Sequence, residues 1–281
     1  MTPRPYILHA LSPLHAGVGQ AAELIDLPIA RLKGTGIPYV PGSSIKGVLR
    51  DDCKTAGTDK DVLEAVFGPD FNNAGAHAGA LICTDARLLA LPVRSFVGTF
   101  AFVTSPLLLG LAARDINQPL AAPTVTNGKC MAAAALAGAN NTVYLEDLDL
   151  QRTDPNAEFN SWLAKIATIF GTGQAVFKPR LAVVDDETMT FLWETATQLD
   201  QRVRIDSDTR TVANGALWLE ESLPPETLLI GQLLAEPSRK PGTNLIPVQV
   251  LDQVLKAERP GLQFGGKSTV GRGRCRMVPL P

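Results

Sequence analysis

Two glycine-rich segments with basic side chains are the parts of this 281-residue sequence best suited to bind phosphate. Residues 41–50 are Pro-Gly-Ser-Ser-Ile-Lys-Gly-Val-Leu-Arg, and residues 264–274 are Phe-Gly-Gly-Lys-Ser-Thr-Val-Gly-Arg-Gly-Arg. Glycine lets a backbone approach a ligand closely, and lysine and arginine neutralise phosphate charge. Both segments therefore predict contacts with a polyanion.

The first segment also predicts the start of a helix. Ser43 or Ser44 can cap a helix N-terminus, where free backbone N–H groups and the helix dipole favour an anion. Lys46 and Arg50 are four residues apart and therefore share one face. Three apolar residues fall on another face: Ile45, Val48 and Leu49. The segment is suited to bind phosphate, and an ordinary capped helix with two solvated basic residues is the alternative interpretation.

The second segment contains a nucleotide-binding pattern that we reject. Residues 261–268 match Gly-x-x-x-x-Gly-Lys-Ser, a loop that in nucleotide hydrolases follows a buried strand and opens a helix. Here an Arg-Pro pair precedes the pattern, and Gly271 and Gly273 interrupt any helix. The sequence also has no acidic residue after Ser268 to bind Mg²⁺. We therefore interpret residues 264–274 only as a flexible, basic loop that binds a polyanion.

Basic residues are concentrated at both ends of a chain whose formal charge is -2. Residues 1–50 hold five basic and two acidic side chains, residues 51–255 hold 15 and 25, and residues 256–281 hold six and one. If the two ends meet in the folded chain, they form a positive surface on a protein that is acidic overall. The overall charge therefore does not exclude a nucleic-acid partner.

Composition and periodicity predict a folded α+β protein, without a Rossmann or barrel repeat. The chain is 45% hydrophobic, enough for a large core, and this excludes disordered and fibrous classes. The expected elements are helices over 51–67, 131–137, 157–170 and 246–255, a strand over 97–104 followed by a short helix, and strands over 203–206 and 216–219 joined by a polar turn.

The sequence favours a cytoplasmic protein without membrane contact. The 19 uncharged residues from Ser95 to Ala113 approach the length of a membrane span, but Pro106 and several polar residues favour a buried strand and a helix. The four cysteines are widely spaced and are expected to be reduced core thiols, because no ligand spacing suggests a zinc site or a disulfide framework.

Several segments, taken in order, resemble the RAMP superfamily. They are residues 14–19 (Leu-His-Ala-Gly-Val-Gly), 25–28 (Ile-Asp-Leu-Pro), 41–50, 85–89 with 92–95 (Asp-Ala-Arg-Leu-Leu and Pro-Val-Arg-Ser), 202–206 (Arg-Val-Arg-Ile-Asp) and 265–273. The two glycine-rich segments are typical of the superfamily. Residues 25–28 and 92–95 are similar to the repeated backbone subunit of the type III-B CRISPR effector, the Cmr complex. The resemblance extends over nearly the whole chain.

The resemblance implies one RAMP domain over residues 1–281, with a modified ferredoxin-like (RRM-like) palm. We expect inserted segments within 51–80 and 115–160 and a protruding thumb hairpin within 203–222. The resemblance also implies that copies of the chain stack in a filament along one CRISPR RNA, together with other Cmr subunits. The thumb would displace one nucleotide of the paired target RNA, which is cut beside it.

The resemblance further implies a catalytic residue, because the aspartate that the family requires for cutting corresponds to Asp26. His15 is a candidate acid or base, with a packed or hydrogen-bonded histidine as the alternative. Glu221, with Glu220, is a candidate to approach the site, and an exposed acidic pair is the favoured alternative. A weakly bound Mg²⁺ or Mn²⁺ ion, whose ligands we do not assign, would assist the carboxylate. The residues expected to contact the guide are Ser43, Ser44, Lys46, Arg50, Gly265, Gly266, Lys267, Thr269, Arg272 and Arg274.

Three functions follow from these expectations. The first is a metal-dependent endoribonuclease that is active within the assembled complex. The others are a non-catalytic guide-binding backbone subunit and an endoribonuclease that processes precursor CRISPR RNA. The first requires the two basic segments to form one groove for RNA, with Asp26 beside a second strand.

Overall fold

The computed structural model describes residues 1–17, 19, 25–70, 73, 75–255 and 259–280, so that Val18, Glu23 and Leu24 of the predicted first loop lie outside this set. The helices are α1 (Gly42–Thr55), α2 (Lys60–Phe67), α3 (Pro106–Ile116), α4 (Ala157–Ala167), α5 (Gln174–Phe177), α6 (Asp186–Thr195) and α7 (Pro247–Val254). Short 3-10 helices are η2 (Ala134–Leu136), η3 (Ala139–Asn141), η4 (Thr168–Gly173), η5 (Lys178–Arg180) and η6 (Ser268–Val270). The strands are β1 (Thr2–Ala10), β2 (Tyr39–Val40), β3 (Leu81–Cys83), β4 (Ala86–Ser95), β5 (Thr99–Thr104), β6 (Lys129–Ala132), β7 (Thr142–Leu145), β8 (Leu148–Thr153), β9 (Leu181–Val184), β10 (Gln198–Ile205), β11 (Val212–Ser222), β12 (Leu228–Ala235), β13 (Arg259–Gln263) and β14 (Arg274–Pro279).

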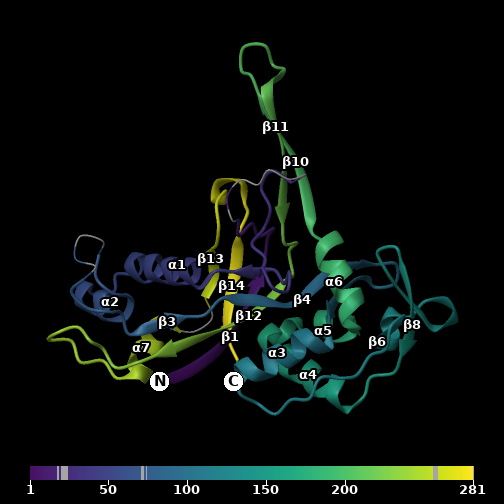
Figure 1. The fold of residues 1–281 in the computed structure, drawn as a ribbon, viewed down its shortest axis with the longest axis horizontal. Coiled ribbons are helices and arrows are strands. Elements are labelled where there is room, and N and C mark those ends of the chain that lie inside the picture. The colour runs from purple at the N-terminus through teal and green to yellow at the C-terminus, as the bar shows by residue number, and fades with distance from the viewer. Residues whose placement is uncertain (18, 20–24, 71–72, 74, 256–258, 281) are drawn as a thin grey trace.

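Twelve strands of the described chain form one mixed sheet (Figure 1). The hydrogen-bonded order is β13-β14-β1-β12-β4-β5-β9-β6-β8-β7, with β2 added to β4 and β3 added to β12. A further pairing of Ser95 in β4 with Leu145 in β7 closes six of these strands into a barrel-like ring. The predicted α+β class is therefore confirmed.

Two clusters of buried side chains stabilise this arrangement. The larger cluster joins strands of the sheet to α1, α2 and α7, and it includes the predicted apolar face at Ile45 and Leu49. The smaller cluster contains Phe102 from β5 together with Phe159 and Trp162 from α4. The helical spacing of the apolar residues in α1 and in α4 thus corresponds to the buried faces of these two helices.

Residues 51–67, which the sequence predicts to be helical, hold the end of α1 and all of α2, and only the break at residues 56–59 departs from the prediction. α1 ends at Thr55, and the carboxylate of Asp59 then caps α2 by accepting hydrogen bonds from the backbone N–H groups of Asp61 and Val62. Such a cap satisfies N–H groups that have no partner inside the helix, so it fixes a new helix start.

The predicted helix over residues 131–137 is wrong. Residues 129–132 form β6, which pairs with β8 and β9, and the side chains at 130–132 are buried. Only residues 134–136 are helical, as the short η2. Pairing within the sheet overrides the helix preference of this alanine-rich stretch.

The long uncharged stretch folds as the sequence predicts, into β5 followed by α3. The hydroxyl of Ser105 accepts a hydrogen bond from the Leu108 N–H, and Pro106 is the first residue of α3. Within the part of the chain that the structure describes, every helix is too short or too polar to span a bilayer. All four cysteines lie within the described residues and are thiols outside any disulfide, buried at Cys53, Cys130 and Cys275 and half-buried at Cys83.

β10 and β11 form a separate two-stranded hairpin that projects from the body (Figure 1). The sequence places the thumb at residues 203–222, and the observed hairpin begins earlier, at Gln198. Its apolar side chains include several that are about half exposed: Leu199, Val203, Ile205, Val212 and Leu217. Because a two-stranded hairpin is only marginally stable alone, contacts at its base must fix its position.

Candidate active site at the base of the hairpin

Three distant segments meet at the base of the hairpin. The first loop (residues 13–31) and the glycine loop (residues 264–273) are joined by a 2.9 Å hydrogen bond from the Gly273 N–H to the carbonyl of Pro13. The first loop is also joined to the chain that follows β11 by a backbone bridge between Leu14 and Leu223. The first loop and the glycine loop, which come from opposite ends of the sequence, therefore lie together at this place.

Two glycines of the glycine loop are required by close backbone packing. Gly265 has a φ of +71°, and a Cβ atom there would lie 2.2 Å from the carbonyl oxygen of His15. Gly273 has a φ of +75°, and its Cβ would lie 1.9 Å from the carbonyl oxygen of Phe264. These contacts seat the glycine loop on the first loop and on itself, so the fold alone explains both glycines.

Asp26 is exposed beside β11. Its Oδ2 accepts a 2.8 Å hydrogen bond from the backbone N–H of Leu219. The neighbouring Leu27 donates its N–H to the carbonyl of Leu219 at 3.1 Å and accepts from the Glu221 N–H at 3.0 Å. The first loop thus adds to β11 like a short parallel strand, which orients the Asp26 carboxylate.

Glu221 is buried, with only 2% of its surface exposed. Its carboxylate accepts hydrogen bonds from the Ile29 N–H at 3.1 Å, from Arg31 at 2.5 Å and from the Thr197 hydroxyl at 2.8 Å. Arg31 also donates to the carbonyl of Trp193 at 3.0 Å. This carboxylate therefore ties the first loop to the hairpin base.

Glu220 is fully buried beside it. Its Oε2 forms an ion pair with the Lys267 ammonium and lies 3.5 Å from Arg202 Nε. Burial raises the pKa of Glu220, but Lys267, followed by Arg272 and Arg202, outweighs burial and holds the pKa below its ordinary value. The alternative of an exposed acidic pair at Glu220 and Glu221 is wrong, because ion pairs stabilise both carboxylates inside the fold.

Asp200 lies directly opposite Glu220 in the hairpin. It accepts a 2.6 Å hydrogen bond from Arg272, which also donates to the Ser222 hydroxyl at 3.0 Å. Burial raises the pKa of Asp200, but its hydrogen bonds from Arg272 and Gln198 outweigh burial and lower the pKa. Arg272 is itself only 6% exposed, so it contacts the hairpin and not the solvent.

His15 is half-buried next to the same strand. Its Nδ1 lies 2.6 Å from the carbonyl oxygen of Glu221. A carbonyl oxygen only accepts, so Nδ1 carries the proton and the other ring nitrogen, Nε2, is the acceptor in the neutral ring. His15 and Asp26 therefore contact backbone groups of β11 that are two residues apart, at Glu221 and Leu219.

Lys46 and Arg50 make their contacts elsewhere, on the side of α1 that faces β3 and the chain after α2. Lys46 donates to the Leu81 carbonyl at 3.0 Å, and Arg50 donates to the Gly68 carbonyl at 3.0 Å and to Asp70 at 2.6 Å. Burial lowers the pKa of Lys46, and Arg50 lowers it further against an opposing effect of Cys83. The contacts found for these two residues do not join them to Lys267 and Arg272.

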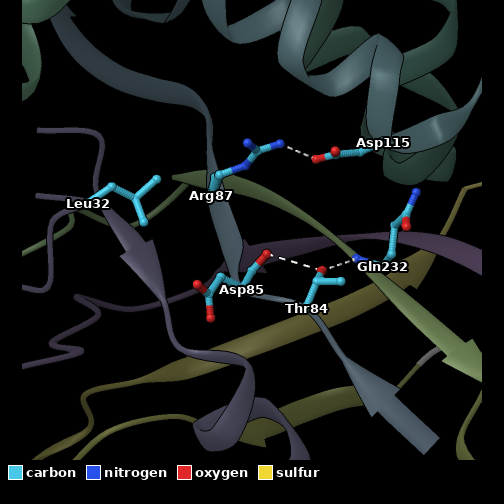
Figure 2. Close-up of a pocket in the computed structure, with 6 residues that line it drawn as sticks. All are labelled: Leu32, Thr84, Asp85, Arg87, Asp115 and Gln232. Atoms are coloured by element: carbon cyan, nitrogen blue, oxygen red, sulfur yellow. Dashed lines mark hydrogen bonds and ion pairs between the residues drawn. The ribbon is translucent and has the colours of Figure 1, made fainter. Parts of the chain in front are cut away.

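The start of α1 is held by Asp85 and not by its own serines. Ser43 and Ser44 are exposed, and neither makes the predicted cap. Instead, Asp85 Oδ1 accepts a 2.8 Å hydrogen bond from the Gly42 N–H. Figure 2 shows Asp85 in a pocket at the turn between β3 and β4, beside Thr84. The capping part of the prediction is wrong because α1 already begins at Gly42, with Pro41 at the N-cap position, so both serines lie inside the first turn of the helix.

The remaining predicted guide contacts, in the glycine loop and at the start of β14, are solvent-accessible. Gly265, Gly266, Thr269 and Arg274 are exposed. Their segment consists of β13, a turn with the short η6, and the antiparallel β14. It does not lead from a strand into a helix, which confirms the rejection of a nucleotide hydrolase loop.

Sequence reasoning does not single out three residues of this cluster: Arg31, Thr197 and Asp200. Arg31 is the cation of the Glu221 pair, and Thr197 donates to the same carboxylate. No local pattern identifies either residue, because the partner is 190 residues away from Arg31 and 24 residues away from Thr197. Asp200 precedes the quoted segment 202–206 and could be found only from the hairpin register.

Comparisons with known proteins agree with this fold. Residues 7–276 match the model of the RAMP superfamily. The chain is 34% identical over 279 residues to the CRISPR system Cmr endoribonuclease Cmr4 of Pyrococcus furiosus, with 96% of this chain and 93% of that protein covered. It is similar to the crystal structure of oligomeric Cmr4 from Pyrococcus furiosus, with a TM-score of 0.76 and 27% identity over 100% of this chain and 98% of that one. It is also similar in fold to a chain of the type III-B Cmr-beta bound to cognate target RNA, with a TM-score of 0.76 and 22% identity over 99% and 97% of the two chains.

Proposed function

The chain belongs to the RAMP superfamily, among the Cmr4 endoribonuclease subunits of type III-B Cmr complexes, and on this premise we propose that Asp26 cuts target RNA at the base of the hairpin. Of the four carboxylates described at the hairpin base, Glu220 and Glu221 are buried in ion pairs, Asp200 is paired with Arg272, and Asp26 is exposed. This contrast is the observation that carries the proposal.

The proposed reaction is attack of a ribose 2′-OH on the neighbouring phosphorus. The P–O bond to the 5′-oxygen of the next nucleotide breaks, which gives a 2′,3′-cyclic phosphate and a 5′-OH end. A nucleotide turned out of the duplex can place its 2′-OH in line with that bond, and such positioning is worth several orders of magnitude in rate. The hairpin, which projects beside Asp26, would hold the target in this geometry.

In this reaction Asp26 accepts the 2′-OH proton, and His15 supplies a proton to the leaving 5′-oxygen. His15 Nδ1 is held by the Glu221 carbonyl, so proton exchange with RNA would involve Nε2 in the protonated ring. Glu221, a catalytic candidate from the sequence, has a positioning role in this proposal, because Ile29, Arg31 and Thr197 already donate to its buried carboxylate.

A divalent ion, Mg²⁺ or Mn²⁺, can be held beside Asp26 only if RNA supplies some of the ligands of the ion. Among the described residues, no three His, Cys, Asp or Glu side chains group to hold a metal. Mg²⁺ in proteins is often held by one or two carboxylates, substrate phosphates and water. Asp26 would be the protein ligand of such a weakly bound ion. When bound, the ion would stabilise negative charge on the phosphate oxygens.

We further propose that CRISPR RNA, copies of this chain and other Cmr subunits are its partners, in the cytoplasm. The exposed Thr269 and Arg274 support guide contact directly. Lys46, Arg50, Lys267 and Arg272 have protein partners, so a guide phosphate would have to share or replace these contacts. The ferredoxin-like description of the palm, the insertions within 51–80 and 115–160 and the thumb role of the hairpin stay predictions.

Reconstituted complex with matched target RNA and Mg²⁺ tests the role of Asp26. We expect Asp26→Asn to slow cutting about 100-fold or more, the usual effect of removing a general base, without weaker target binding. Asp149→Asn, at an exposed residue of β8, is the matched control.

Full cutting by Asp26→Asn would remove Asp26 from the mechanism. Uncut target with the wild type would favour a non-catalytic backbone subunit, and cleavage of a repeat hairpin by the isolated chain would favour precursor processing.

A further inference from the structure

Glu220 is a fully buried carboxylate that the proposed chemistry does not use. It forms an ion pair with Lys267 and lies 3.5 Å from Arg202 Nε. Removing two charges from water is costly, and an apolar pair of similar size is often as stable as a buried ion pair. Stability alone therefore does not explain why a charge is present at this position.

The place of Glu220 in β11 indicates its role. The residue before it, Leu219, donates its N–H to Asp26, and the residue after it, Glu221, donates its N–H to Leu27. A shift of β11 by one residue would turn every side chain to the other face and bring a different N–H to Asp26. The orientation of Asp26 thus depends on the register of a two-stranded hairpin.

A cluster of charges around Glu220, formed by Asp200, Lys267 and Arg272 besides Arg202, selects this register. Glu220 lies directly opposite Asp200, and like charges at opposed positions destabilise a strand pair. Lys267 offsets the charge of Glu220, and Arg272 offsets that of Asp200. Both cations come from the glycine loop, which is seated on the first loop by the contact of Gly273 with Pro13. The observed register is therefore favoured when the glycine loop is in place.

We propose that Glu220 is a positioning residue, which with Asp200, Lys267 and Arg272 locks β11 in the register that presents the Leu219 N–H to Asp26. The predicted effect on cutting rests on the proposed function of Asp26. The effect on the Leu219 amide does not depend on that function, so the two ideas can fail separately.

The amide resonance of Leu219 in the isotope-labelled full chain, without RNA, tests the positioning directly. We expect Glu220→Gln to move this resonance in the same direction as Asp26→Asn, which removes the charged acceptor. Glu64→Gln is the matched control, because Glu64 is also ion-paired, with Lys240. Lys267→Met is a second variant in case Glu220→Gln fails to fold, because Lys267 is partly exposed.

The single and double variants distinguish register control from general packing. Lys267→Met removes the cation that offsets Glu220, so the repulsion between the carboxylates of Glu220 and Asp200 grows. The double variant Glu220→Gln/Lys267→Met also removes the charge of Glu220, and with it this repulsion. We therefore expect a larger Leu219 shift in Lys267→Met than in the double variant. An unmoved Leu219 resonance in both Glu220→Gln and Lys267→Met would overturn the proposal.

Cutting by the assembled complex provides the second readout. At saturating target we expect Glu220→Gln to lower the single-turnover rate about tenfold, because small displacements of a catalytic group reduce rate strongly, while target affinity stays the same. A wild-type rate despite a displaced Leu219 resonance would contradict the positioning role. If Asp26→Asn itself cuts normally, the proposed function fails, and the amide measurement still decides whether Glu220 sets the register.

Discussion

The carboxylate of Asp26 accepts a hydrogen bond from the backbone N–H of Leu219, which lies 193 residues later in the chain. The adjacent Leu27 bonds to the backbone on both sides of Glu220, so a strand of the projecting hairpin holds the catalytic candidate. The position of Asp26 is therefore sensitive to every contact that fixes the hairpin base, including contacts made by the glycine loop.

Gly265→Ala is expected to destabilise the protein. The new Cβ would lie 2.2 Å from the carbonyl oxygen of His15, and the φ of +71° is unfavourable for alanine. We expect the free energy of unfolding to fall by about 2 kcal/mol or more, as for overpacked sites. Denaturant unfolding of the purified chain measures this change.

Gly266→Ala is the control for this substitution, because no atom lies within 4 Å of a Cβ placed there and its φ is not in the left-handed region. A change within about 0.5 kcal/mol is expected for such a site. Equal effects of the two substitutions would show that contact of the glycine loop with His15 does not stabilise the fold.

Local sequence features predicted the parts of the site that depend on local physics. The glycine-rich composition of residues 264–274 indicated close backbone approach, and Gly265 makes such an approach. The apolar spacing at Ile45 and Leu49 indicated the buried face of α1. The role proposed for Asp26 rests on the family resemblance, because an aspartate in an irregular loop has no pattern of its own.

Burial and pairing of charges could not be predicted in the same way. An acidic pair after a strand is usually exposed, whereas Glu220 and Glu221 are buried because Lys267 and Arg31 reach them from distant loops. Helical spacing placed Lys46 on one face of α1, but the Leu81 carbonyl as its partner depends on how β3 packs. Such pairings are decided by tertiary structure.

Acid is expected to destabilise the hairpin base. Burial raises the pKa of Glu220 and of Asp200, but their cationic partners outweigh burial, so both values lie below the ordinary range. A carboxyl group with a lowered folded pKa stabilises the protein above its unfolded pKa, and this contribution is lost as the pH falls through the folded pKa. We therefore expect the free energy of unfolding to decrease below about pH 4, near the unfolded values.

Urea unfolding over a pH series measures this loss. Asp200→Asn should make the acid-side dependence shallower, because one of the two carboxyl groups no longer titrates. Asp149→Asn on β8 should keep the wild-type dependence, because Asp149 is exposed outside the charge cluster. A wild-type acid slope in Asp200→Asn would show that this ion pair does not contribute.

Metal dependence can be tested at the scissile phosphate. If an ion is shared between Asp26 and the phosphate, sulfur in place of a non-bridging oxygen should slow cutting in Mg²⁺ about tenfold or more, because such contacts stabilise developing charge. Mn²⁺ or Cd²⁺, which bind sulfur better, should restore the rate in the wild type but not in Asp26→Asn. Equal sulfur effects in all metals would argue against direct metal contact at that oxygen.

Salt dependence of guide binding separates exposed basic residues from those with protein partners. Removing a side chain that neutralises one guide phosphate should make the slope of log affinity against log salt shallower by roughly 0.7 for single-stranded RNA. We expect this full change for the exposed Arg274→Ala and smaller changes for Lys46→Ala and Lys267→Ala, whose ammonium groups already contact Leu81 and Glu220. Lys178→Ala, at an exposed residue of η5, is the control and should keep the wild-type slope.

An unchanged slope in Arg274→Ala would place this residue outside the guide interface. A full change in Lys267→Ala would mean that a guide phosphate displaces Glu220 from its cation.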